Sequence, residues 1–192
     1  LIGSPLAKVR AADFAPTTTR VNVSSSGVQA NGSTEEAAAI SADGRYVAFL
    51  SGASNLAGVG YFNGDAYVKD TQTGAIECVN VSSEEVHGNG DCYTRMAISA
   101  DGRFVAFASN SSNLVDGDVA DGYLDIYVRD RLNGTTELVS KSSAGVTGND
   151  GSVAPVISAD GRFVAFQSGA TNLATGDLAG ATDVFVHDRQ TG

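Results

Sequence analysis

The sequence predicts an all-β protein, a β-propeller built from four-stranded antiparallel blades with three blades in the chain. Three observations lead to this prediction. The run Ile-Ser-Ala-Asp-Gly-Arg occurs three times, beginning at Ile40, Ile98 and Ile157. Each copy continues into an apolar segment and then into a second segment that begins and ends with aspartate. No segment combines the apolar spacing of a helix with capping residues.

Four short strands can be traced within one unit. In the third copy, residues 152–158 are a short apolar segment, and residues 159–161 form a tight turn of Ala, Asp and Gly. Residues 162–168 are apolar on both faces, which is typical of a strand buried on both sides. Residues 183–188 supply the next strand, and residues 135–143 show the kind of strand that follows the next glycine turn. A repeat of about 58 residues is too long for a β-helix and suits a propeller blade.

One aspartate recurs in the turn of each copy. Asp43, Asp101 and Asp160 stand between alanine and glycine, once per unit. Such regular recurrence indicates hydrogen bonding within the turn, not catalysis. We expect the arginine that follows each of them to pair locally or with a neighbouring blade.

The run I-S-A-D-G-R-[YF]-V-A-F resembles the repeat of the TolB-like β-propeller family. The usual core of that repeat is S-P-D-G-[KR]-x-[IL]-A-F, followed by a D-[IV]-[YFW]-[VL] strand. Here Ala42, Ala100 and Ala159 stand where the family usually has proline. The resemblance extends over residues 17–192 and implies an exported, extracytoplasmic propeller protein. No catalytic residue of the family maps onto this chain.

The repeats also predict how the chain is organised. Residues 1–16 match no repeat and are expected to be an N-terminal leader or arm, and the three units run over residues 17–74, 75–134 and 135–192. The fourth strand that the third unit lacks has its counterpart at residues 17–23. Three blades expose apolar faces unless a ring is closed. We therefore expect either part of a longer propeller or a head-to-tail homodimer, a six-bladed ring in which each chain lends its N-terminal strand.

Composition and charge exclude some partners. The net charge is −10, with 12 Lys and Arg against 22 Asp and Glu. Binding to nucleic acid depends on clustered cations that neutralise phosphates, and no basic stripe occurs here. We therefore expect no nucleic-acid partner, and the absence of an apolar run of membrane-spanning length predicts no membrane insertion.

The second unit carries an acidic loop that resembles a calcium site. Asp116, Asp118 and Asp121 follow the spacing of D-x-D-x-x-D-G loops, with Asp125 beyond them. Carboxylates at this spacing wrap a hard cation, so Ca²⁺ is the cofactor that the sequence suggests. The alternative is that these aspartates cap turns and the start of a strand.

The inner strands are expected to line a central channel, where propellers bind ligands. They carry the polar residues Glu35, Glu36, Tyr93 and Arg95, which are candidate ligand-binding residues. The alternative is that they are solvated residues with no ligand.

The histidines and cysteines occupy positions where the other units have different residues. His87 aligns with Gln29 and Thr147, and His187 falls where the other units have lysine or arginine. Both are interpreted as ordinary substitutions at variable polar positions. Cys78 and Cys92 occur only in the second unit, which suggests a disulfide. The alternative is a buried thiol at Cys78 and an exposed one at Cys92.

These patterns favour a non-enzymatic binding or scaffolding module that contacts a protein or glycan. One alternative is a hydrolase or lyase whose propeller supports a site at the channel mouth, built from the acidic loop with Tyr93 and Arg95. Another is a propeller fragment with no activity of its own.

Overall fold

The computed structural model describes residues 18–57, 64–117, 121–177 and 181–192. The described residues form strands and no helix, so they contain no helix that is long and apolar enough to cross a membrane. The leader or arm expected at residues 1–16 lies outside the described residues. The strands are β1 Thr34–Ile40, β2 Tyr46–Ser51, β3 Asp65–Asp70, β4 Ile76–Cys78, β5 Cys92–Ile98, β6 Phe104–Ser109, β7 Asp125–Asp130, β8 Thr135–Leu138, β9 Ser152–Ile157, β10 Phe163–Ser168 and β11 Asp183–Asp188.

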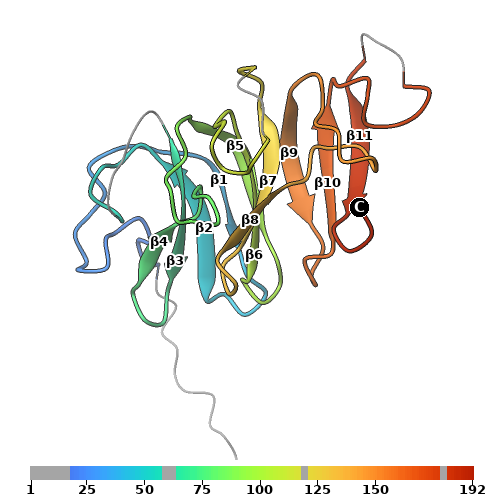
Figure 1. Cartoon of the computed structure of the whole chain (residues 1–192). Coiled ribbons are helices and arrows are strands. Elements are labelled where there is room, and N and C mark those ends of the chain that lie inside the picture. Colours follow the sequence, from blue (N-terminus) through green and yellow to red (C-terminus); the bar gives the residue numbers. More distant parts are fainter. Residues whose placement is uncertain (1–17, 58–63, 118–120, 178–180) are drawn as a thin grey trace, which may run out of the picture.

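The strands form three antiparallel sheets that stand side by side as blades (Figure 1). The first blade has the order β1-β2-β3-β4 and the second β5-β6-β7-β8. The third contains β9, β10 and β11, and among the described residues no fourth strand pairs with β11. Four-stranded blades are therefore confirmed for the first two sheets, and the third has three strands.

The Ala-Asp-Gly turn is held by the same hydrogen bonds in every blade. In the first blade, Ser41 Oγ donates to Asp43 Oδ1 at 2.6 Å, and the N–H of Arg45 donates to the same oxygen at 3.0 Å. These bonds lower the pKa of Asp43. Gly44 follows with a φ of +73°, which glycine adopts without strain. The predicted turn role is confirmed, and Arg45 pairs with Asp70 of its own blade at 2.7 Å.

Neighbouring blades pack through equivalent apolar side chains. We call the face of a blade that contacts the following blade its exit face. In the first blade the exit face is at most 3% exposed and packs on Val105, Phe107 and Tyr127 of the second. The exit face of the second blade is fully buried and packs on Val164 and Phe166 of the third. The exit faces consist of Ala48, Leu50, Ala66 and Val68 in the first blade and of Ala106, Ala108, Ile126 and Val128 in the second.

The inner strands β1, β5 and β9 lie next to one another and form the inner edge of the array. The N–H of Ala42 donates to Ala100 O, and the N–H of Ala100 donates to Ala159 O, each at 2.9 Å. Thr94 and Ala154 have φ values of +65° and +54°, in strands whose ladders shift register. These irregular positions contact each other, because Ala154 N–H donates to Thr94 Oγ1 at 3.4 Å. The bulges thus help to align neighbouring blades.

The third blade leaves its exit face uncovered. Val184 and Val186 of β11 are 70% and 66% exposed. The corresponding strands β3 and β7 are buried at every residue. The difference arises because a blade follows each of the first two, whereas in the described chain none follows the third.

Residues 18–30 cover the first blade as residues 76–88 cover the second. Lys69 Nζ donates to Val23 O at 3.0 Å and to Ser24 O at 3.1 Å. At the equivalent place in the second blade, Arg129 Nη1 donates to Ser82 O at 2.9 Å. Residues 18–23 therefore lie in the position of a fourth strand that belongs to a preceding blade.

Candidate metal centre

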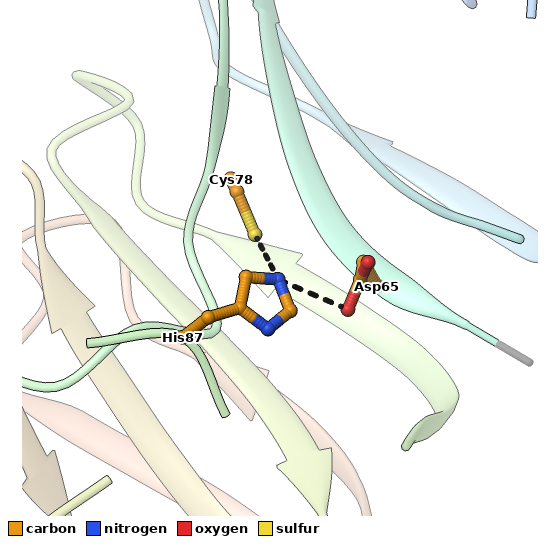
Figure 2. Close-up of side chains that lie close together, drawn as sticks. All are labelled: Asp65, Cys78 and His87. Atoms are coloured by element: carbon orange, nitrogen blue, oxygen red, sulfur yellow. Dashed lines mark hydrogen bonds and ion pairs between the residues drawn. The ribbon is translucent and has the colours of Figure 1, made fainter. Parts of the chain in front are cut away.

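Three side chains with metal-binding atoms meet beside the first blade (Figure 2). His87 Nε2 lies 3.4 Å from Cys78 Sγ and 3.3 Å from Asp65 Oδ1. The three ligand atoms all lie within 4.8 Å of one another. Within the described part of the chain, no other group of three His, Cys, Asp or Glu residues is gathered in this way.

The sheet and one return loop bring these residues together. Asp65 is the first residue of β3 and Cys78 is the last of β4, where it pairs with Tyr67. The chain then turns back, and a bridge between Val81 and His87 places the imidazole over the sheet. The side chain of Asp65 is 2% exposed and that of His87 is 16% exposed, so water is largely excluded.

Asn80 positions the acid and the thiol. Its Nδ2 donates to Asp65 Oδ1 at 3.0 Å. Its Oδ1 accepts from the N–H of Ala66 and from the Cys78 thiol, both at 2.9 Å. The amide therefore holds both side chains in the orientation that faces His87.

A second contact fixes the tautomer of His87. Its Nδ1 lies 3.0 Å from the carbonyl oxygen of Gly88. A carbonyl oxygen only accepts, so Nδ1 carries the proton. In the neutral imidazole, Nε2 is then the atom able to bind a metal, and it is the nitrogen that faces Asp65 and Cys78.

The electrostatics and geometry of the cluster argue against nucleophilic catalysis by Cys78. Burial, and then the charge of Asp65, raises the pKa of the Cys78 thiol to about 12, and a protonated thiol is a poor nucleophile. Burial also raises the pKa of Asp65, against the hydrogen bond from Asn80 and the charge of His87. In a catalytic triad the acid contacts the imidazole nitrogen that the nucleophile does not, whereas here both contact Nε2.

The acidic loop of the second blade is only partly described. Asp116 and Asp121 are exposed, and Asp118 lies outside the described residues. Asp125 is 3% exposed and accepts a hydrogen bond from Ser140 Oγ. Among the described residues, Asp116, Asp121 and Asp125 do not form a group of close ligand atoms. Calcium binding by this loop stays a prediction.

The predicted channel residues lie on inner strands. Tyr93 on β5 is 41% exposed, and its hydroxyl donates to Asp91 Oδ2 at 2.8 Å. Arg95 on the same strand is also exposed. Glu35 and Glu36 lie on β1, but their side chains are outside the described part of the structure. A ligand at these residues stays a prediction.

The disulfide suggested by the sequence is wrong, because Cys78 and Cys92 are both free thiols. Cys92 begins β5, pairs with Ser109 and is 3% exposed. Cys78 is half-buried and faces His87 instead. The alternative assignment is reversed as well, since Cys92 is the buried thiol.

Comparison of the units could have indicated the cluster. Cys78 and His87 stand where the next unit has Leu138 and Thr147. They lie nine residues apart, on a strand and its return loop. Two departures from the repeat on a strand and on the loop that folds back over it are a stronger signal than either alone, whereas each taken singly indicates an ordinary substitution.

No family model matches the chain, and no curated protein matches it. Among solved structures, the β-propeller domain of the Trilobed protease from Pyrococcus furiosus superposes with a TM-score of 0.50 at 14% identity, over 84% of this chain and 41% of that one. The fold is that of a β-propeller. The tricorn protease gives a TM-score of 0.51 at 19% identity, over 81% of this chain and 14% of that one.

A putative TolB from Agrobacterium tumefaciens is also similar, with a TM-score of 0.48 at 18% identity, over 84% of this chain and 47% of that one. The chain thus spans less than half the length of each of these structures. At such identities the likeness concerns the fold alone.

Proposed function

We propose that this chain is a non-enzymatic binding or scaffolding module that forms half of a six-bladed propeller ring with a second copy of itself. The observation that carries the proposal is the uncovered exit face of the third blade. Val184 and Val186 are 70% and 66% exposed, whereas the equivalent Ile126 and Val128 are fully buried by the following blade. A second copy offers a blade of the same design to cover them.

Residues 18–23 supply the strand that β11 lacks. They align with residues 76–81, which contain β4, and with residues 136–141, which include β8 except for its first residue. In the second blade Arg129 pairs with Thr136. The same register sets His187 opposite Thr18 of a second copy, and it closes the open edge of β11.

An exposed aspartate at the start of β11 supports this register. Asp65 accepts from Asn80, and Asp125 accepts from Ser140, and both carboxylates are buried. The equivalent Asp183 is exposed. In the ring, Asn22 of the second copy stands at the position of Asn80 and donates to Asp183 as Asn80 donates to Asp65.

The ring gives the module its binding surface. The inner strands of both copies enclose one channel, with Tyr93 and Arg95 on its wall, and a protein or glycan is the expected ligand. An extracytoplasmic location follows from the resemblance to TolB-like repeats. No contact among the described residues favours the alternative of a hydrolase or lyase.

Solution mass tests the assembly. We expect light scattering after size exclusion to give twice the chain mass of 19.5 kDa. Val186→Lys should raise the dimer dissociation constant by about a hundredfold or more, because burying an unpaired ammonium costs several kcal/mol. Leu132→Lys is the matched control, since Leu132 is 75% exposed on the turn after β7.

A monomer at all concentrations, or equal dimerisation by Val186→Lys, contradicts the proposal. If the chain is monomeric and a longer polypeptide with further blades forms a closed propeller, the exit face is covered within that longer chain and not by a second copy.

A further inference from the structure

The cluster of Asp65, Cys78 and His87 has the dimensions of a tetrahedral zinc site. With ordinary zinc–ligand bond lengths, sulfur and nitrogen ligands lie about 3.6 Å apart, and nitrogen and oxygen ligands about 3.4 Å apart. The observed separations are 3.4 Å from Cys78 Sγ to His87 Nε2 and 3.3 Å from His87 Nε2 to Asp65 Oδ1. Two of the three separations therefore match those of a tetrahedral site, and the third, from Cys78 Sγ to the Asp65 carboxylate, is within 4.8 Å.

The neighbouring polar groups orient these ligands. The Nδ1–H of His87 donates to Gly88 O, a contact that metal-binding histidines commonly make. Asn80 donates to Asp65 and accepts from the Cys78 thiol. On metal binding, the thiol proton leaves to solvent, and a sulfur–metal bond replaces the hydrogen bond to Asn80.

The fold itself does not require this combination of residues. In the second blade, the equivalent of Asp65 is Asp125, which is satisfied by Ser140. The positions of Cys78 and His87 are there occupied by Leu138 and Thr147, in the same strand and loop. Two soft or borderline ligands thus appear in one blade, around an aspartate that the fold already buries.

We propose that Asp65, Cys78 and His87 bind one divalent transition metal per chain, with Zn²⁺ the best match to a sulfur, nitrogen and oxygen donor set. The three protein ligands leave a fourth position for water or for a group of a bound ligand. The site lies within one chain, so it does not depend on ring assembly.

The competing interpretation is an ion pair between protonated His87 and Asp65 that binds no metal. The role of the Cys78 thiol distinguishes the two interpretations. An ion pair needs no sulfur, whereas a metal site forms a sulfur–metal bond with its own electronic absorption.

The test uses the full chain after treatment with chelator and removal of the chelator. We expect calorimetric titration with Zn²⁺ to show one ion per chain. Co²⁺ in place of Zn²⁺ should produce a thiolate-to-cobalt charge-transfer absorption. Cys78→Leu and His87→Thr introduce the residues of the second blade. Each should weaken Zn²⁺ binding by about tenfold or more, because losing even a residue that only orients a metal ligand costs about that much.

Cys92→Ser is the matched control, because Ser152 occupies that position in the third blade. It should keep both the stoichiometry and the cobalt absorption. Absence of Zn²⁺ binding by the folded wild-type chain overturns the proposal and leaves the ion pair. Cobalt absorption that persists in Cys78→Leu overturns it as well.

Discussion

At the scale of single residues, each contact between described blades packs an aromatic ring of one blade against a glycine and an arginine of the next. The guanidinium carbon of Arg189 lies 4.3 Å from the ring centroid of Phe104. Arg189 Nη1 donates to the carbonyl oxygen of Gly161, and a Cβ added to Gly161 would lie 2.1 Å from a carbon of the same ring. Glycine is thus needed here for space as well as for its φ of +74°.

Gly161→Ala should therefore lower the free energy of unfolding by about 2–4 kcal/mol, from left-handed backbone strain and overpacking together. Gly117→Ala is the control, because Gly117 has a φ of +79° and nothing within 4 Å of an added Cβ. It should cost only the backbone part, about 1–2 kcal/mol. Urea unfolding of both variants measures the difference. Equal losses of stability would contradict the overpacking and mean that the Phe104 side chain moves aside freely.

The sequence predicted some residue roles and missed others. The turn role of Asp43 could be predicted, because its hydrogen bonds to Ser41 and Arg45 are local. The contact between His87 and Asp65 joins residues that a loop and a sheet bring together, so it depends on the path of the chain. The positive φ of Thr94 has no local signal, since threonine usually avoids it.

At the scale of elements, the third strand of each blade carries one buried basic residue under the loop that enters the blade. Lys69 and Arg129 donate to carbonyl oxygens of those loops. In β11 the position is held by His187, which is 8% exposed. Burial, and then the charge of Lys141, lowers the pKa of His187, although Glu137 and Asp188 oppose this.

The lowered pKa of His187 predicts a pH dependence of stability. The unfolded chain takes up this proton near the ordinary pKa of 6.5, whereas the folded chain resists it. Stability should therefore fall as the pH drops below about 6.5, until the folded-state pKa is passed. Urea unfolding between pH 8 and pH 5, at about half-unit steps, measures this.

His187→Gln should flatten that part of the pH profile, and His87→Thr controls for the other histidine. An NMR titration gives the pKa of His187 directly. A value at or above 6.5 would contradict the assignment.

The strand pattern was predicted more accurately than the strand ends. The segment expected at residues 183–188 coincides with β11. The strand expected at residues 135–143 is shorter, since β8 ends at Leu138. Beyond it the chain leaves the sheet to cover the following blade, where Lys141 bridges to Thr147. Leu138 and Val139, on either side of the strand end, are both apolar, so this pair does not indicate where the strand stops.

At the scale of the whole molecule, the same type of ion pair recurs at each contact between blades. Arg131 of the second blade pairs with Glu77 of the first, and Arg189 of the third pairs with Glu137 of the second. At the remaining contact, between the first blade and residues 18–30, both partners are threonine, Thr71 and Thr19. Both partners of the ion pair are thus replaced at this contact, as expected if the two positions also face each other there.

Ring closure then gives Gly44 a role that it lacks within one chain. Gly102 and Gly161 each contact the aromatic ring of the preceding blade, whereas an added Cβ at Gly44 meets nothing within 4 Å. In the proposed ring, Gly44 faces Phe163 of the second copy, which is 40% exposed in the single chain. The last contact of the ring would thus repeat the other two.

Gly44→Ala should consequently weaken dimerisation. The overpacked ring should raise the dimer dissociation constant by about tenfold or more, since overpacking typically costs about 1–3 kcal/mol. Light scattering over a dilution series measures this constant, with Gly117→Ala as the control for backbone strain alone. If Gly44→Ala dimerises as tightly as Gly117→Ala, Phe163 does not meet Gly44. The two copies would then have to be joined by some other arrangement of blades.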